Sequence, residues 1–193
     1  MVNKYIFNRG KKNTILLIHG LYTTSGFWLS YFKLFKNYRI IAFDINYDKL
    51  LKSDFSINIL KDTFYVDGHI VGVISHSFGT VISDLVFDRN IEKIFKICPV
   101  AFSKRLESSN FVLDIVNKTN LSEDSINNNI KLVRSYMLKV KKYISYRGQL
   151  YIPNIDCYFS YEIPPKKKID FTGNHFNISL ALENIIEKLS FSN

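Results

Sequence analysis

Short runs of largely apolar residues recur along this chain of 193 residues, and most end at a polar or small side chain. A run that is apolar throughout, rather than alternating with polar residues, is typical of a strand buried on both faces of a parallel sheet. The runs are Thr14–Ile18, Arg39–Phe43, His69–Ile74, Lys93–Cys98, Ile155–Tyr161 and Lys168–Thr172. They predict a mostly parallel sheet with helices on both of its faces.

The segments between these runs are mostly long enough for the helices that connect parallel strands. We expect such helices near Phe27–Phe35 and near Phe78–Asp88. An amphipathic pattern over residues 178–189 predicts a further helix at the end of the sequence. The alternation of strands and helices predicts one domain, residues 1–193, with a three-layer, doubly wound α/β architecture.

The beginning of the sequence has the pattern of a hairpin. Tyr5–Phe7 is a short apolar run, and Asn8–Gly10 has turn-forming residues. We therefore expect this first strand to pair with the strand that begins at Thr14.

Residues 101–150 depart from the alternation. They predict two or three helices, near Phe111–Asn117 and Ser125–Ile144, with no strand between them, and Ser122 and Asp124 are N-cap signals for the second helix. A helical insertion between two strands of an α/β sheet is a natural lid over a site at the carboxyl ends of the strands. Ordinary crossover helices are the alternative.

The net charge of the sequence is +9 at pH 7. No helix or repeat gathers the lysines with interleaved aromatic residues, so we expect no nucleic-acid binding. The charge is that of a solubilising surface, or it attracts an acidic partner or an anionic substrate. No apolar run reaches the ~20 residues that a membrane-spanning helix needs, and the first residues lack the pattern of a secretory signal. We expect a cytoplasmic protein without a membrane span.

The two cysteines, Cys98 and Cys157, lie inside apolar runs. We expect both to be small buried side chains, because neither has the spacing of a metal ligand and nothing indicates an oxidising compartment.

The segment Ser75–Gly79 carries the strongest chemical signal. It has small residues two positions before and two positions after Ser77, directly between a strand and a helix. Small residues at these positions permit a sharp strand-to-helix turn that exposes the serine at the helix N-terminus. There the free N–H groups and the helix dipole favour developing negative charge. We therefore expect Ser77 to be a nucleophile.

A second signal is the sequence His19-Gly20-Leu21 after the first long apolar run. An acyl-transfer site needs two donors aimed at the tetrahedral oxyanion, and backbone N–H groups supply them without rearrangement. We expect these donors to be the N–H groups of Leu21 and Phe78. His19 itself is interpreted as a structural residue that orients the loop.

A third signal is the segment Gly173–Phe176 between the last predicted strand and the last helix. A serine hydroxyl is a poor nucleophile until a nearby imidazole accepts its proton. His175 is the one histidine on a loop at the carboxyl end of a late strand, because His69 opens a strand, His76 lies in the turn before the nucleophile and His19 precedes the oxyanion loop. We expect His175 to be the general base.

Together these motifs resemble those of the α/β-hydrolase superfamily. His19-Gly20-Leu21, Asp44 after the next strand, Ser75–Gly79 and Gly173–Phe176 occur in that family's order and cover nearly the whole chain. The motifs around Ser77 and His175 are similar to those of small thioesterases that release acyl chains from carrier proteins.

The resemblance implies an acid in the loop after the strand that precedes the histidine strand. With Ile155–Tyr161 as that strand, the acid is Glu162, whereas Asp156 and Asp170 lie within predicted strands and point to the wrong end. Another carboxylate, or no working acid, are the alternatives. Only 13 positions separate Glu162 from His175, too few for the usual connecting helix. We therefore expect either a reduced core or an unusual pairing of the last strands.

Aromatic residues gather on the loops around the proposed site and predict an apolar pocket for an acyl or aromatic substrate. The expected pocket residues are Tyr22, Trp28, Phe102 and Phe176, with Phe27, Phe78 and Phe111 nearby.

These features predict a serine hydrolase that cleaves a carboxylic ester or thioester through an acyl-enzyme, without a metal or organic cofactor. The expected substrate is a small acyl ester or thioester, and the basic surface is compatible with one carried on an acidic acyl carrier protein. The alternative is an α/β-hydrolase scaffold with a non-hydrolytic role, as an acyltransferase, a cyclase or lyase, or a binding protein.

Overall fold

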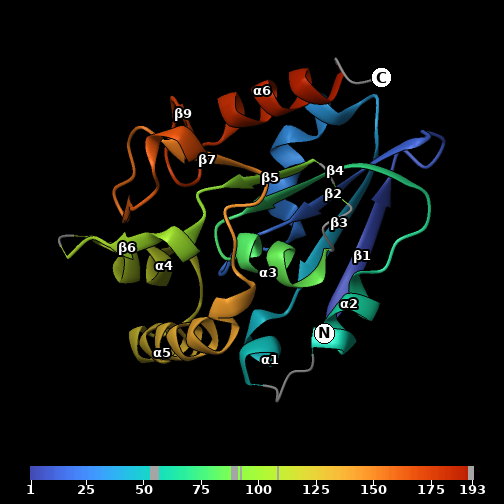
Figure 1. The fold of residues 1–193 in the computed structure, drawn as a ribbon. Helices are drawn as coiled ribbons and strands as arrows, with labels where there is room; N and C mark the ends of the chain where they lie inside the picture. Colours follow the sequence, from blue (N-terminus) through green and yellow to red (C-terminus); the bar gives the residue numbers. More distant parts are fainter. Residues whose placement is uncertain (53–56, 88–90, 92, 108, 191–193) are drawn as a thin grey trace.

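The computed structural model describes residues 1–52, 57–87, 91, 93–107 and 109–190. Its main feature is a seven-stranded sheet with the strand order β1-β3-β2-β4-β5-β7-β9, in which β1 is antiparallel to its neighbour and the other strands are parallel (Figure 1). The strands of this sheet are β1 Val2–Phe7, β2 Asn13–Ile18, β3 Arg39–Ile45, β4 His69–His76, β5 Ile94–Ile97, β7 Gln149–Pro153 and β9 Lys168–Phe171. A separate antiparallel pair joins β6 Ser103–Arg105 to β8 Phe159–Tyr161.

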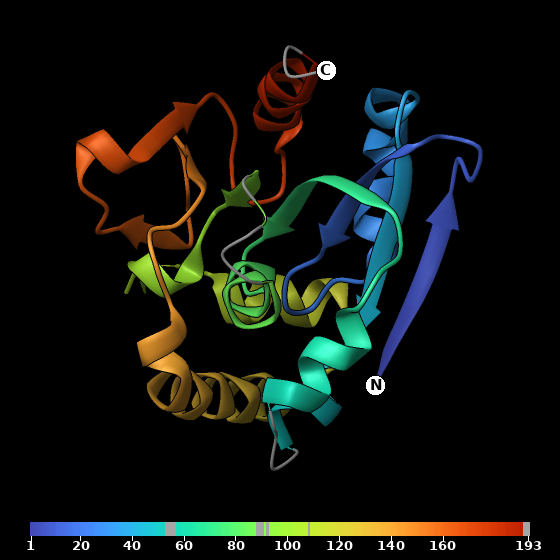
Figure 2. The same cartoon turned by 45° about the vertical axis from the view of Figure 1, so that its right-hand side comes forward.

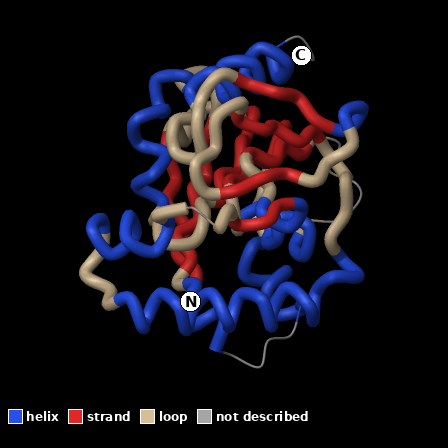
Figure 3. The backbone as a smooth tube through the Cα atoms, turned by 90° about the vertical axis from the view of Figure 1, so that its left-hand side faces the viewer, coloured by secondary structure: helices blue, strands red, loops and turns tan. Residues whose placement is uncertain are grey.

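Helices cover both faces of the sheet, and the strands lie between them (Figure 3). Because side chains alternate across a strand, Leu16 and Ile18 of β2 pack on one face while Ile15 and Leu17 pack on the other. The first face is covered by α1, α2 and α3, and the second by η1 and α6. The bounds are η1 Ser25–Phe35, α1 Tyr47–Lys52, α2 Ile57–Phe64, α3 Gly79–Val86 and α6 Ser179–Ser190. This confirms the predicted three-layer, doubly wound α/β architecture. Asp88, the predicted end of the helix near Phe78–Asp88, lies outside the described residues.

The predicted opening hairpin is wrong. β1 pairs with β3, from Val2 opposite Ile45 to Phe7 opposite Ile40, so β3 lies between β1 and β2. The turn residues do reverse the chain, and Asn8 has a φ of 52°. However, β3 is buried over most of its length and needs a neighbour on each side, whereas β1 is half exposed and suits the sheet edge.

The prediction of the late strands is also wrong in one respect. Ile155–Tyr161 does not form a strand of the main sheet; only Phe159–Tyr161 is extended, as β8 of the small sheet. The strand of the main sheet is β7, Gln149–Pro153, which lies between β5 and β9. The connection from β7 to β9 contains β8 and the short 3₁₀ helix η4, Pro165–Lys167, in place of an α-helix.

The segment between β5 and β7 is mainly helical. It contains η2 Val100–Phe102, α4 Phe111–Lys118, α5 Glu123–Val140 and η3 Lys141–Tyr143, together with β6. The Ser122 hydroxyl caps α5 by accepting a hydrogen bond from the N–H of Ser125 at 3.2 Å, as the sequence predicts. In Figure 2, α5 lies at the bottom of the molecule beside α1.

A buried ion pair fixes the point where this segment returns to the sheet. Lys96 on β5 donates to Asp84 on α3 at 2.6 Å and to the carbonyl oxygen of Ser145 at 2.8 Å. The N–H of Ser145 in turn donates to Asp84. Burial lowers the pKa of Lys96 and raises the pKa of Asp84. The attraction between the two charges shifts both pKa values in the opposite direction, but by less.

In the described part of the chain, no helix combines the length and apolar character needed to cross a membrane. Both cysteines are free thiols. Cys98 is buried, as predicted, but Cys157 is exposed because the segment around it is a loop and not a buried strand.

Candidate active site

Ser77 lies in a strained turn between β4 and α3. Its φ is +53°, a left-handed conformation that costs a non-glycine residue energy and is kept where the surroundings enforce it. The turn leaves no room for a side chain at Gly79, where a Cβ would stand 2.5 Å from the carbonyl oxygen of His19. The turn also leaves no room for a side chain at Gly20, where a Cβ would stand 2.8 Å from Cβ of Ser77. The small residues of both motifs thus bring the two loops into direct contact.

His175 connects Ser77 to a carboxylate. Its Nε2 lies 3.1 Å from Oγ of Ser77, and its Nδ1 lies 3.0 Å from Oδ2 of Asp156. The side chains of His175 and Asp156 are only 3% and 2% exposed, and Ser77 is 8% exposed. The three side chains come from the β4–α3 turn, the β9–α6 loop and the β7–β8 loop. They have the serine–histidine–acid connectivity of a catalytic triad.

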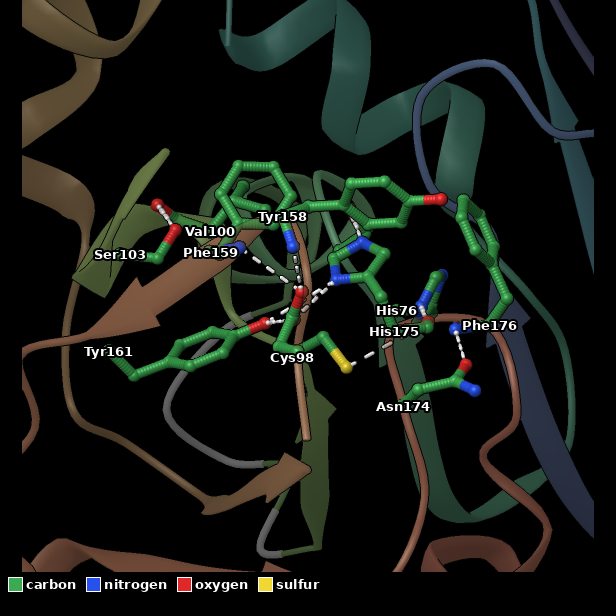
Figure 4. Close-up of polar contacts among 12 residues, drawn as sticks. His76, Cys98, Val100, Ser103, Tyr158, Phe159, Tyr161, Asn174, His175 and Phe176 are labelled. Atoms are coloured by element: carbon green, nitrogen blue, oxygen red, sulfur yellow. Dashed lines mark hydrogen bonds and ion pairs between the residues drawn. The ribbon is translucent and has the colours of Figure 1, made fainter. Parts of the chain in front are cut away.

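The loop of His175 is itself held in place. Oδ1 of Asn174 accepts the backbone N–H groups of Phe176 and Asn177 at 3.0 and 2.9 Å, which tightens the turn. The carbonyl oxygen of His175 accepts a hydrogen bond from Nε2 of His76 at 2.7 Å (Figure 4). The imidazole therefore reaches Ser77 from a fixed backbone.

Asp156 is bound by four donors. Its Oδ1 accepts the N–H groups of Tyr158 and Phe159 at 2.9 and 3.1 Å. Its Oδ2 accepts His175 and, at 2.6 Å, the hydroxyl of Tyr161. Burial raises the pKa of Asp156, but the hydrogen bond and charge of His175, with the bonds from Tyr161 and Tyr158, hold it below the usual value. The carboxylate is therefore ionised at neutral pH.

The structure places Glu162 away from this group. Its side chain is 63% exposed and forms an ion pair with Lys104 at 2.5 Å, while its backbone N–H donates to the carbonyl oxygen of Phe102. Glu162 is therefore not in position to contact His175, contrary to the sequence-based assignment of Glu162 as the acid. The physical reason is the misplaced strand: the strand before β9 in the main sheet is β7, and the carboxylate that follows β7 is Asp156.

Two further histidines are buried around the turn, and both are neutral. His19 donates from Nδ1 to the carbonyl oxygen of Gly20 at 2.8 Å and accepts the N–H of Ile45 on Nε2 at 2.9 Å. Burial lowers the pKa of His19. It also lowers the pKa of His76 to about 3, and the neighbouring His175 contributes. The ring of Phe27 stacks on His76 at 4.7 Å. These contacts agree with a structural role for His19.

A cavity of about 1040 Å³ opens at Ser77. Leu21 and Phe78 both line it, and among the described residues no group accepts a hydrogen bond from either backbone N–H. The other residues of the lining come mainly from the segment between β5 and β7. The helical segment over residues 101–150 thus forms much of the cavity wall.

The expected pocket residues divide into two groups. Phe102 and Phe176 line the cavity, as does the nearby Phe111. Trp28 does not, because it is fully buried in the core between η1 and the sheet. Tyr22 lies outside the lining as well, and its hydroxyl donates to the carbonyl oxygen of Ile126 on α5 at 3.3 Å. Both residues lie close to the His19 loop in the sequence, but that closeness does not determine where their rings point.

Among the described residues, one group has donor atoms close enough together to suggest a metal site: Cys98, Asp156 and His175. Burial raises the pKa of the Cys98 thiol well above its usual value, with a contribution from Asp156. A thiol that stays protonated is a poor metal ligand, and Nδ1 of His175 is already engaged with Asp156. The chemistry of the three donors therefore does not fit a metal centre.

Sequence reasoning missed Asp156 and Tyr161. A signal for Asp156 was present, because Gly148 precedes Leu150-Tyr151-Ile152 and Pro153 follows it, which is the punctuation of a short strand. No signal pointed to Tyr161, whose position depends on the pairing of β8 with β6.

No family model matches the sequence, and comparison with curated proteins gives no match. Solved structures, in contrast, are similar over nearly the whole chain. The NocB thioesterase domain, in covalent complex with a fluorophosphonate nocardicin G analogue, has a TM-score of 0.62 at 12% identity, covering 97% of this chain and 99% of that one. An ancestral haloalkane dehalogenase has a TM-score of 0.61 at 10% identity, covering 99% and 96%.

A third similar structure is the monoacylglycerol lipase of Paleococcus ferrophilus, with a TM-score of 0.56, 15% identity and full coverage of both chains. These proteins differ in activity, so at such low identity they identify an architecture and not a reaction. The strand order, the turn at Ser77 and this structural similarity lead to one conclusion: the chain has the α/β-hydrolase fold.

Proposed function

We propose that the protein is a serine hydrolase that cleaves carboxylic esters or thioesters, with Ser77 as nucleophile, His175 as general base and Asp156 as acid. The observation that carries the proposal is the position of His175, whose two ring nitrogens lie 3.1 Å from Ser77 and 3.0 Å from Asp156. Asp156 replaces Glu162 in the sequence-based scheme. An ionised carboxylate beside Nδ1 selects the tautomer that leaves Nε2 free to accept the serine proton.

The reaction would proceed in two stages. His175 accepts the Ser77 proton as Oγ attacks the carbonyl carbon, and the N–H groups of Leu21 and Phe78 stabilise the oxyanion. The imidazolium then protonates the leaving alcohol or thiol, which gives the acyl-enzyme. In the second stage His175 accepts a proton from water, the hydroxide attacks the acyl carbon, and the acid is released as Ser77 regains its proton.

The cavity supports an acyl substrate. Phe102, Phe111 and Phe176 supply apolar walls to the cavity that opens at Ser77. The volume of this cavity, about 1040 Å³, is slightly above the range of about 300–1,000 Å³ for small-molecule sites. The helical segment over residues 101–150 would act as the lid. A substrate carried on an acidic acyl carrier protein agrees with the net charge of +9.

Asp156 also bears on the non-hydrolytic alternative. That alternative rests on the uncertain acid and on the missing connecting helix between the last strands, and the buried carboxylate at His175 removes the first of these reasons. Acyl transfer to an acceptor other than water would use the same acyl-enzyme.

A fluorophosphonate probe tests the proposal directly. The wild-type protein should be labelled on the peptide that contains Ser77. The label should be absent in Ser77→Ala but present in Ser160→Ala, which removes an exposed serine that is not part of the cavity lining. Hydrolysis of 4-nitrophenyl esters and acyl-pantetheine thioesters should follow the same pattern. A folded wild-type protein that neither reacts with the probe nor hydrolyses either substrate class would overturn the proposal.

A further inference from the structure

The face of α5 toward the cavity combines apolar and basic side chains. Residues spaced by three and four positions share one side of a helix, and six such residues line the cavity. They are Ile130, Val133, Arg134, Met137, Leu138 and, directly after the helix, Lys141. Arg134 and Lys141 are seven positions apart, so two cations stand on the same stripe as the apolar residues. A basic residue on such a stripe faces the cavity and not only the solvent.

The remaining charges of the lining do not balance these cations. β6 adds Lys104 and Arg105, and Lys104 is paired with Glu162, which leaves Arg105. Glu107 is the one acidic residue in the lining as described. Within the described part of the chain, Arg105, Arg134 and Lys141 form no ion pair.

Asp156 does not offset this charge either. It lies behind His175 and is not part of the cavity lining, and its carboxylate is fully engaged by four donors. The cavity that opens at Ser77 therefore combines apolar side chains with an excess of positive charge from α5 and β6. Like charges that face one cavity without counter-ions repel each other and raise the local concentration of anions.

We infer that the substrate carries an anionic group, a carboxylate or a phosphate, that is bound by Arg105, Arg134 and Lys141 while its carbonyl group lies at Ser77. This inference rests on the proposed hydrolase function and names its substrate class. The planar guanidinium groups of the two arginines suit either anion, because both present paired oxygen atoms.

Matched esters test the inference. We would compare 4-nitrophenyl valerate, which is neutral, with mono-4-nitrophenyl glutarate, which is anionic and of similar length, and with the cationic 4-nitrophenyl ester of 4-(trimethylammonio)butyrate. The expected order of kcat/KM is anionic, neutral, cationic, with roughly tenfold between the first two, since hydrogen bonds to charged groups exceed neutral ones. The preference should shrink as NaCl rises, because the Debye length falls to about 3 Å at 1 M salt.

A second pair of substrates shows which part of the substrate carries the anionic group. Butyryl-pantetheine and butyryl-4′-phosphopantetheine differ by one phosphate on the leaving group. A preference for the phosphorylated thioester with none for the glutarate ester places the anion on the leaving group, and the reverse places it on the acyl chain. Either result supports an anionic substrate.

Substitutions of the basic residues test whether Arg134 and Lys141 cause the preference for anionic esters. Arg134→Gln and Lys141→Gln should each reduce the ratio of anionic to neutral kcat/KM about threefold or more, the size of a partly exposed charge contact. Lys139→Gln is the matched control, because Lys139 is exposed on α5 but is not part of the cavity lining, and it should leave the ratio unchanged.

Binding to Ser77→Ala separates this inference from the proposed function, because it needs no turnover. Calorimetry should show tighter binding of the glutarate ester than of the valerate ester. Equal kcat/KM for the neutral and anionic members of both the ester pair and the pantetheine pair in an active enzyme, or equal binding within both pairs to Ser77→Ala, overturns the inference and leaves the hydrolase function standing. Absence of both probe labelling and turnover, with tighter anionic binding retained, overturns the hydrolase function instead.

Discussion

The hydroxyl group of Tyr161 donates a hydrogen bond to Oδ2 of Asp156 across 2.6 Å. The same oxygen faces Nδ1 of His175, and the hydroxyl lies 3.4 Å from that nitrogen. Two donors thus share one carboxylate oxygen. Burial keeps the Tyr161 hydroxyl protonated by raising its pKa, with contributions from Cys98 and Asp156. In the proposed mechanism Tyr161 is a positioning residue, because it contacts Asp156 and His175 but does not line the cavity.

Replacing Tyr161 with phenylalanine should therefore change the pH profile as well as the rate. Without this donor, more negative charge stays on Oδ2 and stabilises the imidazolium form of His175. The acid limb of the kcat/KM profile should move to higher pH. The value of kcat should fall about tenfold, because Asp156 loses one of its four donors and holds the imidazole less firmly toward Ser77. Tyr158→Phe is the control, since its hydroxyl donates to Asp114 and not to Asp156. An unchanged profile in Tyr161→Phe would contradict the assignment.

Two carboxylate variants decide which residue is the acid. Asp156→Asn should reduce kcat by about 10³–10⁴, since a neutral amide neither selects the tautomer of His175 nor stabilises its protonated form. Glu162→Gln should leave kcat within about twofold, because it removes an exposed ion pair. Circular dichroism would show whether both variants are folded. Full activity in Asp156→Asn together with a large loss in Glu162→Gln would restore the original assignment.

Much of the fold was predictable because the buried strands have a strong local signal. β2, β3 and β4 are largely apolar, and their positions agree with the predicted runs within two residues at each end. The pairing of β1 was not predictable from its own residues, since it depends on which strand needs a second neighbour. Ser77 and His175 were identified because each lies at a strand end marked by a distinctive local sequence.

The position of Asp156 beside His175 was missed because the rule was applied to the wrong strand. In β7 only Leu150, Tyr151 and Ile152 are consecutive apolar residues, and three residues are too few for periodicity to separate a strand from the end of a helix. The longer run that begins at Ile155 has more apolar residues, but Ile155 is 68% exposed. Burial of a short strand is a property of the assembled sheet, and sequence alone does not display it.

Replacing Gly79 with alanine should destabilise the protein. The added Cβ would stand 2.5 Å from the carbonyl oxygen of His19 and 2.7 Å from that of Ile18, so α3 must move away from β2. Crowding of this kind typically costs about 1–3 kcal/mol. The shift also displaces Ser77, so kcat should fall. Urea unfolding measures the first effect and ester hydrolysis the second.

Gly10→Ala is the matched control for this substitution. A Cβ at Gly10 has no atom within 4 Å, so the free energy of unfolding should stay within about 0.5 kcal/mol of the wild-type value. Equal stability of Gly79→Ala and Gly10→Ala would contradict the close approach of α3 to β2.

Lowering the pH should destabilise the protein at pH values well above those at which its carboxylates become protonated. The pKa of His76 is lowered to about 3 in the folded state, against about 6.5 in an unfolded chain, and burial also lowers the pKa of His19. Between these values the unfolded state binds more protons. Stability therefore rises with pH across this window and is lost as pH falls through it, by up to about 1.4 kcal/mol per pH unit for each buried histidine. Asp156, whose folded pKa lies below its usual value, adds to the loss only below about pH 4.

Histidine variants separate this effect from general acid sensitivity. His76→Gln keeps a side-chain N–H that can reach the carbonyl oxygen of His175, but it cannot be protonated. Urea titrations between pH 4 and 6 give the slope of the unfolding free energy against pH. In this variant the slope should fall by the equivalent of about one proton taken up on unfolding. Equal slopes in wild type and His76→Gln would mean that His76 accepts a proton in the folded protein as readily as in the unfolded chain.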